Sequence, residues 1–316
     1  RPEQHPDPTM LTALQNIAPL FLVIGLGAAL RRFGFVSTEG AATLSRLVFR
    51  VAAPALLLRS VGTQPLADTA QFGTIAVIVG ASVLTATVTY LIARGQPRRR
   101  VGVLAQGAFR SNTVFFGLPV VTQAYGDAAV ARAAVVIGTM VITYNLLGAL
   151  VLALPRERVS ARSADLWRDT LKEMAGNPLV LGILGGIALS ASGWSLPNVA
   201  DRTLEMIGRT ALPLALLSIG SGLNPRHLPR EWRPALVISI VKLVVYPASI
   251  WLALRFLGLE GEALAVPVVL LSSPCAVMAY IMAKEMNGDE QLASAIVIGS
   301  TMLAVVTSVG WLVVLG

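Results

Sequence analysis

Apolar residues occupy most of the chain in long stretches that short polar connections separate. Ten stretches can be placed, and most hold about 20 residues, enough for a helix rising about 1.5 Å per residue to cross a hydrocarbon core of about 30 Å. The sixth is short for a full crossing. This pattern predicts an all-α membrane protein with ten transmembrane helices. The stretches span residues 10–30, 41–60, 71–93, 101–124, 128–154, 178–192, 204–223, 234–257, 263–283 and 292–315.

The composition agrees with a membrane protein. Of the 316 residues, 55% are hydrophobic and 13% are charged, whereas a soluble domain of this length needs far more polar surface. The net charge of +8 would suit nucleic acid, but the basic residues cluster in every second connection, as membrane topology requires. We therefore expect no nucleic acid partner, cytoplasmic Arg-rich connections, and both termini outside an inner (plasma) membrane. The clustered residues are Arg31 and Arg32; Arg94, Arg98, Arg99 and Arg100; Arg156, Arg158, Arg162, Arg168 and Lys172; Arg226, Arg230 and Arg233; and Lys284.

The sequence offers no catalytic constellation. The first apolar stretch is too long for a cleavable signal peptide and lacks a basic leader, so residues 1–9 are interpreted as a polar tail. Cys275 is the single cysteine, which excludes an internal disulfide and a cysteine-based metal cluster. Metalloprotease, diphosphate and phosphate-loop motifs are also absent from the sequence. We expect no enzyme activity, no metal and no cofactor.

The two halves of the chain resemble each other. "APLFLVIGLGAAL" from Ala18 matches "NPLVLGILGGIAL" from Asn177, and the same offset of 159 pairs "RVAAPALLL" with "RTALPLALL". Further on, "YGDAAVARAAVVIGTM" from Tyr125 matches "NGDEQLASAIVIGSTM" from Asn287 at an offset of 162. Each half holds five stretches, an odd number, so the halves cross the membrane in opposite senses. Such inverted repeats are typical of secondary transporters.

The repeat defines the predicted domain organisation. A long connection of mixed charge links the two halves on the cytoplasmic side. The predicted units are a polar tail (1–9), a first five-helix repeat (10–154), the connecting loop (155–177) and a second, inverted five-helix repeat (178–316).

Two stretches carry helix-breaking residues at matching depth. The fourth contains "RSNTVFFGLP" from Arg110, about 15 to 18 Å from its cytoplasmic end, and the ninth contains "LSSPCA", about 18 Å from the opposite end. Proline removes a backbone donor, so both helices are predicted to break at the midplane. Ser273 is placed to cap a half-helix with Pro274 at its first position, and Gly117 to Pro119 form a similar start. Prolines that merely kink both helices are the alternative.

These breaks predict an anion site, because buried half-helix starts carry partial positive charge and unpaired N–H groups. Asn112 and Ser273 are expected to hydrogen-bond the anion, and Arg110 or Lys242 to supply charge. Arg110 has the alternative role of bracing the broken backbone. Lys242 has two alternatives, snorkelling to the cytoplasmic boundary and standing in for a bound cation. The predicted binding residues are Arg110, Asn112, Thr113, Gly117, Pro119, Lys242, Ser273, Pro274 and Cys275.

The motif R-x-N-x-x-F-x-G-L-P from Arg110, together with "PLALLSIG" from Pro213, resembles the auxin efflux carrier family, including its bacterial malonate-permease-like members. The resemblance covers nearly the whole chain. It implies an inverted five-plus-five fold, broken helices that cross in the fourth and ninth spans, and export or exchange of small organic anions. It also implies a scaffold of spans 1, 2, 6 and 7 beside a moving core of spans 3–5 and 8–10. The plant pattern has asparagine at both crossovers, whereas Ser273 and Pro274 occupy the second crossover here.

We therefore expect a secondary transporter of small organic anions that works in the lipid bilayer by alternating access of the elevator type. Basic residues outnumber acidic ones within the stretches, and Glu205 lies one turn before Arg209, where a local ion pair is favoured over a proton relay. The alternatives are a sodium-coupled organic anion symporter on a similar fold and a membrane receptor that binds the solute without moving it. The oligomeric state stays open, with a homodimer as one arrangement.

Overall fold

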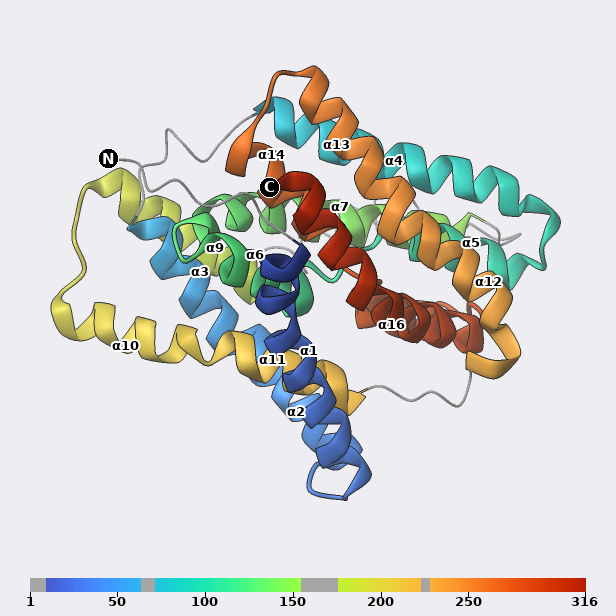
Figure 1. The fold of residues 1–316 in the computed structure, drawn as a ribbon, viewed down its shortest axis with the longest axis horizontal. Coiled ribbons are helices and arrows are strands. Elements are labelled where there is room, and N and C mark those ends of the chain that lie inside the picture. Colours follow the sequence, from blue (N-terminus) through green and yellow to red (C-terminus); the bar gives the residue numbers. More distant parts are fainter. Residues whose placement is uncertain (1–9, 64–71, 155–175, 223–227) are drawn as a thin grey trace.

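The structure, a computed structural model, describes residues 10–63, 72–154, 176–222 and 228–316. These residues form helices and contain no strand, apart from one isolated β-bridge (Figure 1). Within this part of the chain, five helical segments are long and apolar enough to cross a membrane. The predicted all-helical class is thereby confirmed for the described residues. The five segments are Glu39–Gly62, Phe72–Gly95, Ala129–Ala153, Arg230–Phe256 and Glu290–Leu315.

Every predicted apolar stretch overlaps at least one helix, because a helix satisfies its own backbone groups where water is absent. The predicted tail and nearly all of the predicted connecting loop lie outside the described residues. The first half comprises α1 (Met10–Arg32), α2 (Thr38–Leu47), η1 (Val48–Ala52), α3 (Ala53–Gly62), α4 (Phe72–Ile92), η3 (Ala93–Gly95), α5 (Arg98–Phe109), η4 (Thr113–Gly117), α6 (Leu118–Tyr125) and α7 (Ala129–Ala153). The second half comprises α9 (Pro178–Ser192), α10 (Asn198–Arg209), α11 (Ala211–Gly222), α12 (Leu228–Ile240), η6 (Val241–Val245), α13 (Tyr246–Phe256), α14 (Gly261–Leu271), α15 (Val277–Glu285) and α16 (Glu290–Leu315).

The helices form two groups that each combine both halves of the sequence. Helices α1, α2, α3, α9, α10 and α11 make the scaffold group, in which α1 packs on α11 and α3 packs on α9 and α10. Helices α4 to α7 and α12 to α16, with η4 and η6, make the crossover group, in which α12 packs on α16 and α13 on α4 and α14. In Figure 1 the scaffold group occupies the lower left, and most of the crossover group lies to its upper right. The groups touch where α1 meets α6 and α16, and where α3 meets α7.

Glycines let the scaffold helices approach each other closely. A Cβ on Gly27 of α1 would lie 2.4 Å from the carbonyl oxygen of Leu217 in α11. A Cβ on Gly186 of α9 would lie 2.8 Å from the carbonyl oxygen of Leu58 in α3. Backbone-to-backbone contact of this kind is how membrane helices pack through small residues. Both positions therefore favour glycine, since a side chain there would push the helices apart.

Ion pairs join helices within each group. In the scaffold group, Arg59 of α3 pairs with Asp201 of α10 at 2.8 Å. Glu205 and Arg209 form the local pair that the sequence predicts, at 2.5 Å. In the crossover group, the pairs are Arg132 of α7 with Glu262 of α14 at 3.9 Å, Lys284 of α15 with Glu290 of α16 at 3.4 Å, and Arg100 of α5 with Glu231 of α12 and with Asp289, the cap of α16.

Candidate functional site

The first interruption begins where α5 ends at Phe109. Arg110 adopts an extended backbone (φ −75°, ψ 99°), and the helix resumes at Thr113 with Asn112 as its cap. The Phe115 N–H donates to Asn112 Oδ1 at 3.2 Å. Gly117 is helical (φ −63°, ψ −46°), so the predicted start at Gly117 was wrong by four residues. The cause is Asn112, since its amide oxygen satisfies a free N–H group of the new helix.

The second interruption follows the end of α14 at Leu271. The chain resumes a helix only at Val277, after an extended Ala276 (φ −70°, ψ 141°). The prediction that Ser273 caps this half-helix with Pro274 at its first position was therefore wrong. The Pro274 carbonyl instead accepts a hydrogen bond from the Asn112 N–H at 2.8 Å, which keeps the segment extended.

The two interruptions bind each other through their backbones. Ser111 and Cys275 form an isolated antiparallel β-bridge. On one side of it the Asn112 N–H bonds Pro274, and on the other the Ala276 N–H donates to the Arg110 carbonyl at 3.1 Å. Breaks in two apolar helices thus satisfy much of their freed backbone against each other rather than against water.

Side chains complete this arrangement at the end of α14. The Leu271 carbonyl accepts hydrogen bonds from Ser111 Oγ at 2.9 Å and from Lys242 Nζ at 2.7 Å. Lys242 is fully buried, and its ammonium also lies 5.0 Å from the centre of the Tyr246 ring. The alternative that Lys242 snorkels to the cytoplasmic boundary is therefore wrong, because its whole side chain is enclosed. The Cys275 N–H is satisfied in the same way by Ser300 Oγ, at 3.0 Å.

Arg110 is 5% exposed and braces α7 in this conformation. Its guanidinium donates to the Tyr144 carbonyl at 2.6 Å and to Asn145 Oδ1 at 2.9 Å, and it lies 5.9 Å from the Tyr144 ring centre. A Cβ on Gly148 would lie 2.9 Å from this guanidinium and 2.7 Å from Gln106 Nε2, so glycine makes room for both. Sequence reasoning missed Tyr144 and Asn145, although adjacent polar residues inside a long apolar helix were an available signal.

Ser273 is the predicted residue with an unused polar group. Its Oγ is buried and has no hydrogen-bond partner among the described residues. It lies against the first interruption, since a Cβ on Gly117 would be 2.6 Å from Ser273 Oγ. Asn112 and Thr113 are also buried, at 8% and 5% exposure. The structure thus brings Asn112, Gly117, Ser273 and Pro274 together, whereas Arg110 reaches toward α7.

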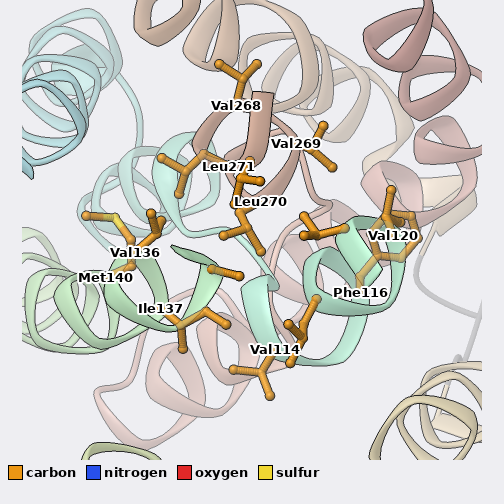
Figure 2. Close-up of a cluster of buried hydrophobic side chains, with 14 of the residues drawn as sticks. Val114, Phe116, Val120, Val136, Ile137, Met140, Val268, Val269, Leu270 and Leu271 are labelled. Atoms are coloured by element: carbon orange, nitrogen blue, oxygen red, sulfur yellow. The ribbon is translucent and has the colours of Figure 1, made fainter. Parts of the chain in front are cut away.

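Apolar side chains close one side of the interruptions. Figure 2 shows that residues of η4, α6, α7 and α14 converge there, with Leu270 between the first interruption and α7. A narrow hollow beside Cys275 is lined by Gln106, Gly107 and Ala279, and it leaves no room for a water molecule. The described residues also contain no group of three or more His, Cys, Asp or Glu that suits a metal ion. The converging residues labelled in Figure 2 are Val114, Phe116, Val120, Val136, Ile137, Met140, Val268, Val269, Leu270 and Leu271.

These features define a multi-pass membrane protein whose centre is a pair of interrupted helices with buried cations. The chain belongs to the family described as membrane transport protein, whose model matches residues 12–312. Because this is a family of transporters, the prediction that the chain is not an enzyme is confirmed, as is its resemblance to the auxin efflux carriers.

Two relatives named as transporters cover most of the chain, and an auxin efflux carrier covers about half of it. An uncharacterized transporter of Methanothermobacter thermautotrophicus is 29% identical over 95% of this chain and 98% of its own length. A protein of Rhizobium meliloti named as a malonate transporter is 25% identical over 94% of this chain and 93% of its own length. Auxin efflux carrier component 1 of Arabidopsis thaliana is 24% identical over 48% of this chain and 25% of its own length.

Proposed function

We propose that the protein is a secondary transporter of small organic anions, which bind between the two interrupted helices. The observation that carries the proposal is the meeting of the two breaks at the bridge between Ser111 and Cys275. Two buried cations, Arg110 and Lys242, flank this meeting point, and their hydrogen-bond partners in the described structure are neutral oxygens rather than carboxylates. Such a centre has an excess of positive charge, which favours an anion as its guest.

The lengths of the first half-helices support a site near the membrane midplane. Helix α5 has 12 residues and α14 has 11, so they span about 18 and 16 Å at about 1.5 Å per residue. Half of a hydrocarbon core is about 15 Å. The antiparallel bridge agrees with entry of these two helices from opposite faces. The basic connections then favour a plasma membrane orientation with both termini outside.

Equivalent contacts in the two halves support an inverted repeat of five plus five spans. The offset of 159 pairs Gly27 with Gly186 and also Leu58 with Leu217. Gly27 packs against Leu217, and Gly186 packs against Leu58, so each half makes the same contact with the other. The two interrupted helices also end at equivalent positions. Helix α5 ends at Phe109 and α14 ends at Leu271, and the offset of 162 pairs these two residues.

The distribution of ion pairs supports movement of one group of helices against the other. The pairs described above join α3 to α10 within the scaffold group and join α5, α7, α12, α14, α15 and α16 within the crossover group. Each group is held together by charges, whereas contacts between groups include apolar pairs such as Phe21 with Phe116, at 5.8 Å between ring centres. An apolar interface slides without breaking ion pairs. In this proposal the crossover group carries the anion by alternating access of the elevator type.

The substrate in this proposal is a mono- or dicarboxylate of the size of malonate or auxin, in line with the names of the relatives. Asn112 and Ser273 are the proposed donors. The Asn112 side chain has an amide NH₂ beyond the oxygen that caps Phe115, and the Ser273 hydroxyl lacks a partner among the described residues. A carboxylate between them would also meet the N–H groups at the start of η4, where an anion is favoured.

Counterflow of radiolabelled malonate and indole-3-acetate into liposomes tests the proposal. Asn112→Asp keeps a capping oxygen for Phe115 but adds negative charge, so we expect a stable protein with at least about tenfold weaker uptake. Asn112→Ala removes both the cap and the donor. Thr87→Ala, on the exposed face of α4, is the matched control that should transport normally. Normal uptake and binding by folded Asn112→Ala and Asn112→Asp would refute this site.

A further inference from the structure

Basic side chains gather at one end of the crossover group, here called the basic end. Helix α4 and η3 pack on α5, and α5 packs on α12. The end of α4, the start of α5 and the start of α12 therefore lie close together, at the right of Figure 1. The proposed orientation places this end on the cytoplasmic side. Its exposed basic residues are Arg94, Arg98, Arg99, Arg230 and Arg233.

The carboxylates of the basic end offset little of this exposed charge. Those of Glu231 and Asp289 both pair with Arg100, which is less exposed than its neighbours. Arg99 donates to two backbone carbonyls in the turn between α15 and α16, at 3.0 and 3.2 Å, and these oxygens carry no net charge. The described contacts thus leave an excess of positive charge at this surface.

Two of the arginines lie over aromatic rings. The Arg94 guanidinium lies 5.7 Å from the centre of the Tyr90 ring, and the Arg233 guanidinium lies 5.4 Å from the centre of the Trp232 ring. Tyrosine and tryptophan are enriched at the level of lipid headgroups, and the planar donors of a guanidinium match the oxygens of a phosphate. Each pair therefore combines a ring that suits the membrane interface with a phosphate-binding group.

Exposed apolar side chains continue from both pairs along the membrane-spanning helices. Leu84 and Leu91 are exposed on α4, two turns apart, and Val237 and Ile240 are exposed on α12, one turn apart. Such faces suit the acyl chains of lipids. The surface thus offers contacts for both parts of an anionic phospholipid, its phosphate and its chains.

We propose that the basic end is a binding surface for anionic phospholipids such as phosphatidylglycerol. The lipid phosphate accepts hydrogen bonds from the exposed arginines, and the acyl chains lie along the exposed faces of α4 and α12. Each arginine near an anionic membrane surface strengthens such binding about fivefold. The inference does not depend on the proposed transport function, because it concerns an outer surface of the crossover group.

Native mass spectrometry of delipidated protein in detergent tests the proposal without a transported substrate. With equal amounts of dioleoyl phosphatidylglycerol and dioleoyl phosphatidylcholine, we expect at least about fivefold more bound phosphatidylglycerol. Glycerol 3-phosphate carries the phosphate without the chains, and an excess of it should leave the bound lipid in place. Equal binding of the two lipids would overturn the proposal. Displacement by glycerol 3-phosphate would also overturn it, since the surface would then bind a free phosphate.

Variants locate the surface. The double variant Arg94→Gln with Arg233→Gln should bind at least about fivefold less phosphatidylglycerol. Arg255→Gln is the matched control that should bind like the parent, since Arg255 is exposed near the other end of the helical segment Arg230–Phe256. Undiminished binding by the double variant would overturn the proposal. If this variant fails to fold, Arg98→Gln with Arg230→Gln removes the same charge and decides in the same way.

Discussion

Replacement of Gly27 by alanine should weaken the contact between α1 and α11. The new Cβ would lie 2.4 Å from the Leu217 carbonyl oxygen and 3.1 Å from its carbonyl carbon. Both atoms belong to the backbone, so no side-chain rotation relieves the clash, and the two helices must separate. Overpacking of this kind typically costs about 1–3 kcal/mol, whereas the higher helix propensity of alanine returns about 0.5–1 kcal/mol.

The expected net loss for Gly27→Ala is therefore up to about 2.5 kcal/mol, or up to roughly 4 °C in the unfolding midpoint of a chain of this length. Gly25 provides the matched control on the same helix, because a Cβ there meets nothing within 4 Å. Gly25→Ala should keep or slightly raise the midpoint. Gly186→Ala should resemble Gly27→Ala with a smaller loss, since its Cβ would lie 2.8 Å from the Leu58 carbonyl oxygen.

Tryptophan fluorescence during thermal unfolding in detergent measures all three variants, with size-exclusion chromatography confirming that each is folded at the start. If Gly27→Ala unfolds at the same temperature as Gly25→Ala, the close approach of α1 and α11 is wrong. If Gly27→Ala is destabilised but Gly186→Ala is not, the equivalence of the two halves loses its main structural support.

Two further predictions concern buried and surface charges. Arg110→Lys keeps the charge but loses the planar fork whose two nitrogens reach the Tyr144 carbonyl and Asn145 Oδ1, so the free energy of unfolding should fall by about 1.5–3 kcal/mol. Chemical denaturation measures this, and an unchanged value would show that Arg110 does not brace α7. The Arg59 guanidinium lowers the pKa of the Asp201 carboxyl through a hydrogen bond. The stabilisation from this pair is therefore complete above the unfolded pKa of about 3.9. It is lost as the pH falls through the lower pKa of the folded state. Asp201→Asn should therefore cost up to about 1 kcal/mol of unfolding free energy at pH 7, and this cost should shrink as pH falls through the folded pKa of Asp201. A pH-independent loss would contradict the pairing.

The interruptions themselves could be predicted because their cause is local. Pro274 lacks a backbone donor, and the repeat pairs it with Asn112, which lies in the polar stretch after Arg110. The sequence alone therefore indicates where α5 and α14 end. The positions at which the helices resume could not be predicted. They depend on the bond from the Asn112 N–H to the Pro274 carbonyl, which joins segments that lie far apart in the chain.

For the two buried cations, the sequence likewise predicted the position in the chain but not the contacts. The sequence indicated that Arg110 and Lys242 sit deep in apolar stretches and therefore need a reason to be there. It left open whether each binds substrate, braces the backbone or reaches the surface. The structure adds their partners, the Tyr144 carbonyl of α7 for Arg110 and the Leu271 carbonyl at the end of α14 for Lys242, and both partners come from other helices.

By itself, the sequence determined the helical membrane class, the internal repeat and the two helix breaks. Apolar run length and proline chemistry are properties of neighbouring residues, and the repeat can be found by comparing the sequence with itself. Only the tertiary structure decided which carbonyl Lys242 bonds, which helix Arg110 braces and which glycines lie at helix contacts. These depend on where distant backbones meet, and in an apolar surrounding each buried polar group must find its partner from whichever segment packs against it.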